Sequence, residues 1–116
     1  MVLIKKGDVF LVNFDPTLGA EARKTRPAVV VSNDINNAHS PIISICPVTS
    51  NVKKVYSFEV EVPQNVGGLD KPSKIMVNQT RAVDKARLMK RIGHLQSEII
   101  SRIDAALRLH YDLDSL

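Results

Sequence analysis

Short apolar runs separated by turn residues fill the first three quarters of the chain. These runs are rich in β-branched and aromatic residues and are too short for helices, so they predict β-strands. Strands are expected at residues 9–14, 28–32, 42–48, 56–62, 73–79 and 88–92. Pro27 stands at the first position of the second strand, and Gly67-Gly68 interrupts the chain before the fifth. Residues 56–62 alternate strictly between polar and apolar, so one face of that strand should meet solvent.

The hydrophobic period changes to that of a helix near the C-terminus. Ser97 can cap a helix, and Glu98 in the first turn would be favoured by the helix dipole. The apolar residues that follow form one stripe at helical spacing: Ile99, Ile100, Ile103, Ala106 and Leu107. A helix is therefore predicted over residues 97–110. Many short strands and one terminal helix predict a mainly β (α+β) fold, a small barrel-like sheet capped by the helix, in a single domain over residues 1–116.

Composition and charge narrow the class of protein. Hydrophobic residues make up 44% of the chain and charged residues 24%, as in ordinary globular proteins. The net charge of +4 suits a polyanionic partner, nucleic acid first and an acidic protein second. Neither an N-terminal signal sequence nor a run of roughly 20 apolar residues is evident, so a cytoplasmic protein without a membrane span is expected.

Metal and thiol chemistry find little support in the sequence. The single cysteine, Cys46, lies in an apolar run, where it is expected to be a small buried hydrophobe. His39, His94 and His110 lack metal-ligand spacing and no carboxylate pair is evident, so neither a metal nor another cofactor is expected.

Two polar segments at strand ends are candidates for chemistry. The connection over residues 15–27 is long for a hairpin and carries Glu21 with the cations Arg23, Lys24 and Arg26. Because Arg26 precedes Pro27, its backbone should be extended at the start of the second strand. At the end of the third strand, residues 49–51 could donate hydrogen bonds to phosphate oxygens, or could simply form a turn.

Several motifs, in order along nearly the whole chain, resemble the signature of the MazF/PemK family of toxins. They are Gly7-Asp8-Val9-Phe10, Asp15-Pro16-Thr17-x-Gly19-x-Glu21-x-x-Lys24-x-Arg26-Pro27 with the following Ala28-Val29-Val30-Val31-Ser32-Asn33, Pro47-Val48-Thr49-Ser50, Asn78-Gln79-Thr80-Arg81-Ala82-Val83-Asp84-Lys85, and Arg91-Ile92-Gly93-x-Leu95. The resemblance implies an SH3-like barrel in a homodimer that cleaves single-stranded RNA. It also implies the toxin component of a type II toxin–antitoxin system, which inhibits translation and growth and is silenced by an acidic, partly disordered antitoxin.

The resemblance also implies roles for individual residues. The family's catalytic arginine falls on Arg26 and its catalytic threonine on Thr49. The candidate RNA-binding residues are Thr17, Gly19, Glu21, Lys24, Ser50, Asn51, Asn78 and Gln79. Asn78 stands where members commonly have aspartate, a departure that bears on base preference. None of the histidines aligns with a catalytic position.

The reaction implied is attack of a ribose 2′-hydroxyl on the adjacent phosphorus, which leaves 2′,3′-cyclic phosphate and 5′-hydroxyl ends. Arg26 suits the stabilisation of charge on the phosphoryl oxygens, because its planar fork of donors matches phosphate. Thr49 and Ser50 could donate to the same oxygens. Arginine is a poor proton carrier because its pKa stays above about 12, so the general acid and base stay unassigned.

Two other functions compete with RNA cleavage. A gyrase poison of the CcdB type shares the barrel-and-helix fold, although it would not need the Lys24-x-Arg26-Pro27 and Thr49-Ser50 motifs. A non-catalytic module that binds RNA or sequesters an antitoxin is the other alternative. Aromatic residues are few, and Phe10, Phe14 and Phe58 fall in predicted strands and are expected in the core, which gives little support for a base-stacking platform.

Overall fold

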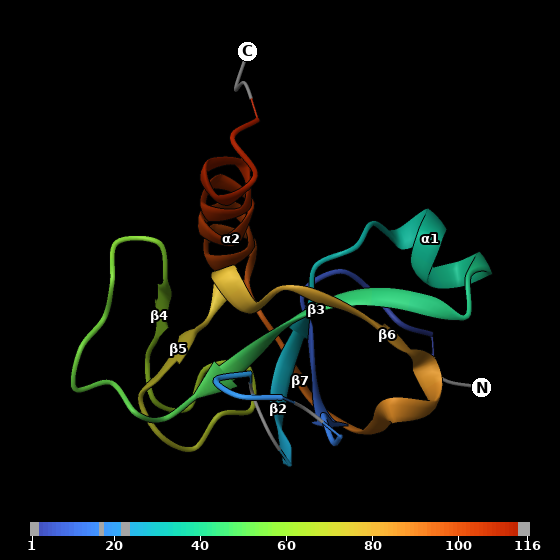
Figure 1. Ribbon diagram of the computed structural model, residues 1–116, viewed down its shortest axis with the longest axis horizontal. Coiled ribbons are helices and arrows are strands. Elements are labelled where there is room, and N and C mark those ends of the chain that lie inside the picture. Colours follow the sequence, from blue (N-terminus) through green and yellow to red (C-terminus); the bar gives the residue numbers. More distant parts are fainter. Residues whose placement is uncertain (1–2, 17, 22–23, 114–116) are drawn as a thin grey trace.

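The chain folds into an antiparallel sheet with one long C-terminal helix, shown in Figure 1 as a computed structural model. The structure describes residues 3–16, 18–21 and 24–113. Its strands are β1 (Asp8–Asn13), β2 (Thr25–Val30), β3 (Ile42–Thr49), β4 (Val60–Val62), β5 (Ser73–Ile75), β6 (Arg81–Asp84) and β7 (Leu88–His94). Its helices are α1 (Asp34–His39), α2 (Ser97–His110) and the 3-10 turns η1 (Val77–Gln79) and η2 (Lys85–Arg87). No described helix is long and apolar enough to cross a membrane.

The strand order of the sheet is β4-β5-β3-β2-β1-β7. Strand β3 pairs with β2 along one side and with β6 and β5 along the other. The first half of β3 pairs with β6, starting at Ile42 opposite Asp84, and its last two residues pair with β5. In that second pairing Thr49 lies opposite Lys74. Segments distant in the sequence therefore meet at the end of β3, where the functional candidates lie.

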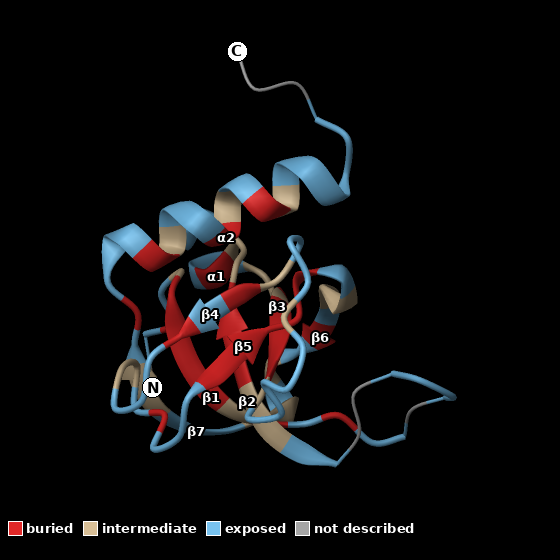
Figure 2. Ribbon diagram, turned by 90° about the vertical axis from the view of Figure 1, so that its left-hand side faces the viewer, coloured by how far each residue is buried: buried red, intermediate tan, exposed pale blue. Residues whose placement is uncertain are grey.

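The central strands are buried on both faces, as their unbroken apolar runs predict. Val9 and Val29 belong to a core cluster on one face, and Phe10 and Val30 belong to a second cluster on the other. Helix α2 covers the first cluster with the buried side chains of its stripe, Ile99, Ile103 and Ala106. Figure 2 shows this buried side of α2 turned toward the buried strands and the opposite side exposed.

Most predicted elements are confirmed, and helix α2 has the predicted bounds. The prediction of a strand over residues 56–62 is wrong in its first half, because only Val60–Val62 is a strand. Residues 56–59 form a turn in which the Glu59 N–H donates to the Tyr56 carbonyl (2.9 Å) and the Tyr56 N–H donates to Glu59 Oε1 (2.9 Å). A side chain that bonds a nearby backbone N–H in this way competes with sheet pairing.

The strand predicted over residues 73–79 ends early, at Ile75. The backbone then turns into η1, in which the Thr80 N–H donates to the Val77 carbonyl at 3.1 Å. Strand β2 begins earlier than predicted, at Thr25, so Pro27 lies inside it. Pairing with β3 starts only at Ala28, so the proline sits where β2 has an open edge.

Some features were not predicted. Helix α1 begins after Asn33, whose side chain accepts a hydrogen bond from the Asn36 N–H (2.8 Å), and β6 adds a strand beside β3. The prediction that Ser97 caps α2 is wrong: Gln96 occupies the N-cap position and makes no side-chain cap bond, and Ser97 is the first helical residue.

Candidate functional site

The two candidate catalytic residues stand just beyond the pairing of β2 with β3, Arg26 near the start of β2 and Thr49 at the end of β3. Ala28 pairs with Pro47 and Val29 with Cys46. Arg26 and Thr49 each stand two residues beyond the last of these pairs, and the same register, continued to them, would set the two residues opposite each other. Both residues are half-buried. The pairing of β2 with β3 therefore brings near each other two strand ends whose candidate residues are more than twenty positions apart in the chain.

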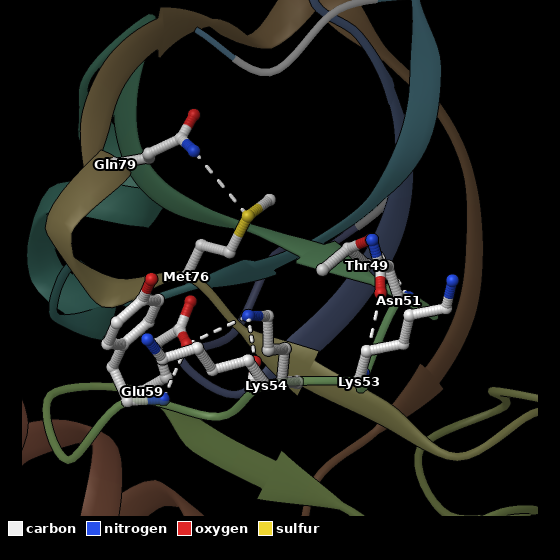
Figure 3. A network of polar contacts seen from close by, with 9 residues as sticks. Thr49, Asn51, Lys53, Lys54, Glu59, Met76 and Gln79 are labelled. Atoms are coloured by element: carbon white, nitrogen blue, oxygen red, sulfur yellow. Dashed lines mark hydrogen bonds and ion pairs between the residues drawn. The ribbon is translucent and has the colours of Figure 1, made fainter. Parts of the chain in front are cut away.

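The end of β3 is closed by a turn that uses the candidate side chains. The Asn51 N–H donates to Thr49 Oγ1 at 3.2 Å, and the Lys53 N–H donates to Asn51 Oδ1 at 3.4 Å (Figure 3). The turn interpretation of residues 49–51 is thus correct for this geometry. It does not exclude phosphate binding, because a hydroxyl oxygen that accepts a bond still carries its own proton to donate.

The ends of the β1–β2 loop are held together at the sheet. Asp15 Oδ1 accepts a hydrogen bond from the Lys24 N–H, and the Phe14 N–H donates to the Lys24 carbonyl, both at 2.9 Å. From η2, Arg87 Nη1 donates to the carbonyls of Asn13 (3.1 Å) and Asp15 (2.7 Å). Thr17, a candidate RNA-binding residue, and Arg23, one of the cations of this loop, lie outside the described residues. Figure 2 shows the exposed loop projecting from the sheet.

A hollow of about 550 Å³ gathers three of the candidate RNA-binding residues. It is lined by Ala20, Glu21, Asn78, Gln79, Thr80 and Arg81. The Leu18 N–H donates to Glu21 Oε1 at 2.6 Å, so the carboxylate also shapes the loop turn in which Gly19 adopts a φ of 55°. Arg81 was not singled out as a site residue, although it follows Asn78-Gln79 in the motif.

Ser50 lies away from that hollow. It lines a smaller one of about 230 Å³, together with Pro27, Val48, Asp70, Lys71 and Ser73. These candidate residues therefore line two separate hollows, and the β4–β5 connection contributes to the smaller one a cation and a carboxylate that the sequence did not point to.

A buried ion pair beside Thr49 was missed from the sequence. Lys74 Nζ lies 2.9 Å from Glu59 Oε1 and donates to the Lys54 carbonyl at 2.7 Å. The Lys74 and Glu59 side chains are only 11% and 5% exposed. No local signal could have found the pair, because its members are fifteen residues apart and the alternation around Glu59 is that of a surface strand.

The remaining titratable candidates lie away from this edge. Cys46 is buried, and removal from water raises the pKa of its thiol to about 12, so it is a neutral hydrophobe as predicted. His94 Nδ1 lies 2.8 Å from Asp8 Oδ1 at the opposite end of β1. Among the residues that the structure describes, no three histidine, cysteine, aspartate or glutamate side chains are grouped to hold a metal ion.

Comparison with known proteins finds similarity along nearly the whole chain. Residues 5–111 match the family model of the PemK-like, MazF-like toxin of type II toxin–antitoxin systems. The chain is 39% identical to endoribonuclease MazF9 of Mycobacterium tuberculosis, over 96% of this chain and 98% of that protein. It is 33% identical to endoribonuclease EndoA of Bacillus subtilis, over 93% and 94% of the two chains.

Solved structures share the fold. The crystal structure of MazF from Deinococcus radiodurans matches with a TM-score of 0.85 at 24% identity, over 97% of this chain and 100% of that one. An endoribonuclease solved in complex with its cognate antitoxin, from a mycobacterial species, matches with a TM-score of 0.80 at 16% identity, over 97% and 99%. The mainly β sheet with a C-terminal helix is therefore the fold of these proteins.

Proposed function

The chain belongs to the family of PemK-like, MazF-like toxins of type II toxin–antitoxin systems and is an endoribonuclease, and we propose that Arg26 and Thr49 catalyse its cleavage of single-stranded RNA. The observation that supports the assignment is the register of β2 and β3, which, if continued two residues beyond its last pair, sets Arg26 opposite Thr49. We propose that both side chains contact the same phosphodiester. The messenger RNA of the cell is the proposed substrate.

The proposed reaction needs only groups of the RNA and of this chain. The ribose 2′-oxygen attacks the adjacent phosphorus, and the bond from phosphorus to the 5′-oxygen breaks. The 2′-hydroxyl loses its proton, and the leaving 5′-oxygen gains one. The products are a 2′,3′-cyclic phosphate and a 5′-hydroxyl. Arg26 and Thr49 stabilise the charge on the phosphoryl oxygens, and the half-buried setting strengthens their hydrogen bonds.

The flanking residues are proposed to bind the strand on both sides of the cleaved bond. Glu21, Asn78 and Gln79 offer carboxylate and amide groups that can pair with base edges in the larger hollow. Lys24, Ser50 and Asn51 lie nearer the strand ends and suit phosphate oxygens, and Gly19 and Thr17 complete the loop. Asn78 both donates and accepts hydrogen bonds, unlike the aspartate common in the family, so its base preference should differ.

The toxin is proposed to act in the cytoplasm, as a single-domain chain that forms homodimers and is inhibited by an acidic antitoxin. The net charge of +4 supports charge steering of both RNA and antitoxin. A gyrase poison of this fold would not require the alignment of Arg26 with Thr49, which favours RNA cleavage.

The test is incubation of the purified protein with a long single-stranded RNA in excess EDTA. We expect fragments with cyclic phosphate ends. Arg26→Ala should lower the rate by at least about 10²–10³-fold, the usual effect of deleting one transition-state donor. Thr49→Ala should lower the cleavage rate by a smaller factor, and Thr49→Ser, which keeps the hydroxyl, should lower it least. Sequencing of the 5′ ends would give the recognised bases.

Arg102→Ala is the matched control, because Arg102 is an exposed arginine paired with Glu98 on α2. It should cut normally. A folded Arg26→Ala protein with near-normal activity would refute the assignment, as would loss of activity on chelation. Gyrase arrest without RNA fragments would support the competing function.

A further inference from the structure

Two aromatic side chains form an exposed stack in the turn that follows β3. The rings of Tyr56 and Phe58 lie with their centroids 5.1 Å apart and their planes 12° from parallel. Tyr56 is 44% exposed and Phe58 36%. The expectation that Phe58 is a core residue is thus wrong. A pair of stacked rings in contact with solvent has the form of a surface for a further planar group.

The turn that carries the stack is hydrogen-bonded to the buried ion pair. Glu59 Oε1 accepts the Tyr56 N–H and also contacts Lys74 Nζ, and Lys74 donates to the Lys54 carbonyl. The turn that carries both rings is therefore fixed by groups almost out of contact with solvent. A ligand that binds the rings would not have to order the turn first.

The stack lies close to the Arg26–Thr49 edge. Lys74 is opposite Thr49 in the pairing of β5 with β3, so the two side chains leave the same face of the sheet. The Lys74 ammonium is 5.6 Å from the centroid of the Tyr56 ring. Figure 3 shows Thr49 and Asn51 on the right of the view, Glu59 on the left and Lys54 between them.

The charge around the stack suits a phosphodiester chain. Lys54 Nζ lies 4.7 Å from the centroid of the Tyr56 ring, and both Lys53 and Lys54 are exposed. The negative charge of Glu59 is offset by Lys74. Aromatic faces beside cations are the combination by which proteins bind single-stranded nucleic acid, since any base can stack and any phosphate can pair.

We propose that the Tyr56–Phe58 stack is an RNA subsite that holds one unpaired base flanking the bond cut at Thr49. The exposed Lys54 ammonium, which lies over the Tyr56 ring in the free protein, moves off the ring when the base stacks and contacts the phosphate of that nucleotide. This inference rests on the proposed function and adds to it a subsite that tolerates any base, outside the hollow formed by Glu21, Asn78 and Gln79.

The first experiment compares cleavage of an RNA with cleavage of matched strands that carry one abasic nucleotide at successive positions. For the wild type, an abasic nucleotide at one flanking position should lower kcat/KM on the order of 10- to 100-fold. Tyr56→Ala should lower kcat/KM by a similar factor and remove the sensitivity to that abasic position. Tyr111→Ala is the control, because Tyr111 is an exposed aromatic residue that follows α2 and should leave both measurements unchanged.

The second experiment separates the subsite from the cleavage reaction. The chain has no tryptophan, so Tyr56→Trp keeps a stacking ring and adds a single fluorophore. Its emission should be quenched by a DNA strand, which lacks the 2′-hydroxyl, and less by the same strand with the abasic position. Thermal unfolding of each variant checks that the fold is retained.

The outcomes are distinct. If the wild type does not cut RNA, the proposed function fails, while quenching by DNA would still support the stacking subsite. If RNA is cut but Tyr56→Ala behaves like Tyr111→Ala and no quenching is seen, the subsite is wrong. Normal RNA cleavage by Tyr56→Ala together with weakened antitoxin binding would also overturn it, and would assign the surface to a protein.

Discussion

At the scale of single residues, the Glu59–Lys74 pair shows how one charged contact shapes a surface. Both groups are removed from water, so each depends on the other and on the hydrogen bonds around it. Glu59 also accepts the Tyr56 N–H, so the pair is joined to the turn over residues 56–59 that precedes β4. Its effect on the protein is thus larger than that of a surface ion pair.

Glu59→Ala should lower the free energy of unfolding by about 3–5 kcal/mol, because it leaves the Lys74 ammonium buried without its counter-charge. Urea denaturation would measure the loss. Glu59→Gln, which keeps an acceptor for both bonds, should lose less. The control is Glu98→Ala, which breaks an exposed pair with Arg102 and should cost at most about 1 kcal/mol. Equal losses for Glu59→Ala and Glu98→Ala would show that the pair has no special role.

At the scale of elements, β7 crosses close to the β4–β5 connection at glycines. A Cβ at Gly93 would overlap the backbone of Gly67, and a Cβ at Gly68 would overlap the Ile92 carbonyl. Gly68 also has a φ of 78°, which side chains rarely adopt. These contacts keep the connection beside β7, next to the first core cluster, where Leu69 and Leu95 are buried.

Gly93→Ala should therefore destabilise the protein by about 1–3 kcal/mol, because one of the two backbones must move. Thermal or urea unfolding would show it. Gly19 serves as the control, since nothing lies within 4 Å of a Cβ at that position. Gly19→Asn, a residue that tolerates positive φ, should change stability by less than about 0.5 kcal/mol. A Gly93→Ala protein as stable as the wild type would mean that the crossing is loosely packed.

At the scale of the whole molecule, apolar side chains remain exposed around α1. Leu3, Ile35 and Ile42 are exposed, and a hollow of about 570 Å³ lies between the N-terminal segment and the end of α1. Strand β6 forms the adjoining edge of the sheet, beside β3 (Figure 1). A small protein with such a surface is expected to bury it, and a two-fold dimer is the simplest way.

We expect sedimentation to show a dimer at micromolar concentration, and Ile42→Glu to shift it toward monomer and lower RNA cleavage. Leu109→Glu is the control, because Leu109 is an exposed apolar residue on α2 and should leave the dimer unchanged. The arrangement would be refuted by a wild-type monomer that is fully active on RNA. A dimer that persists in Ile42→Glu would place the interface on another surface.

The sequence by itself determined the class of fold and named the candidate site residues. A strand buried on both faces requires an unbroken apolar run, as in β1, β2 and β3, and a helix buried on one side requires an apolar stripe, as in α2. Both are local patterns that can be read from the sequence. Arg26 and Thr49 could be named because motifs mark the strand ends that carry them. Local pattern also identified Cys46 as a core residue.

Only the tertiary structure decided which polar and aromatic residues face inward or outward around the end of β3. The alternation over residues 56–62 is compatible with a full strand, yet Glu59 turns inward to meet Lys74, and Tyr56 and Phe58 stay outside. The position of the Arg26 strand end relative to the Thr49 strand end depends on the register between β2 and β3. Both outcomes follow from pairing between distant segments, and a local hydrophobic period carries no information about which distant segment will supply the partner.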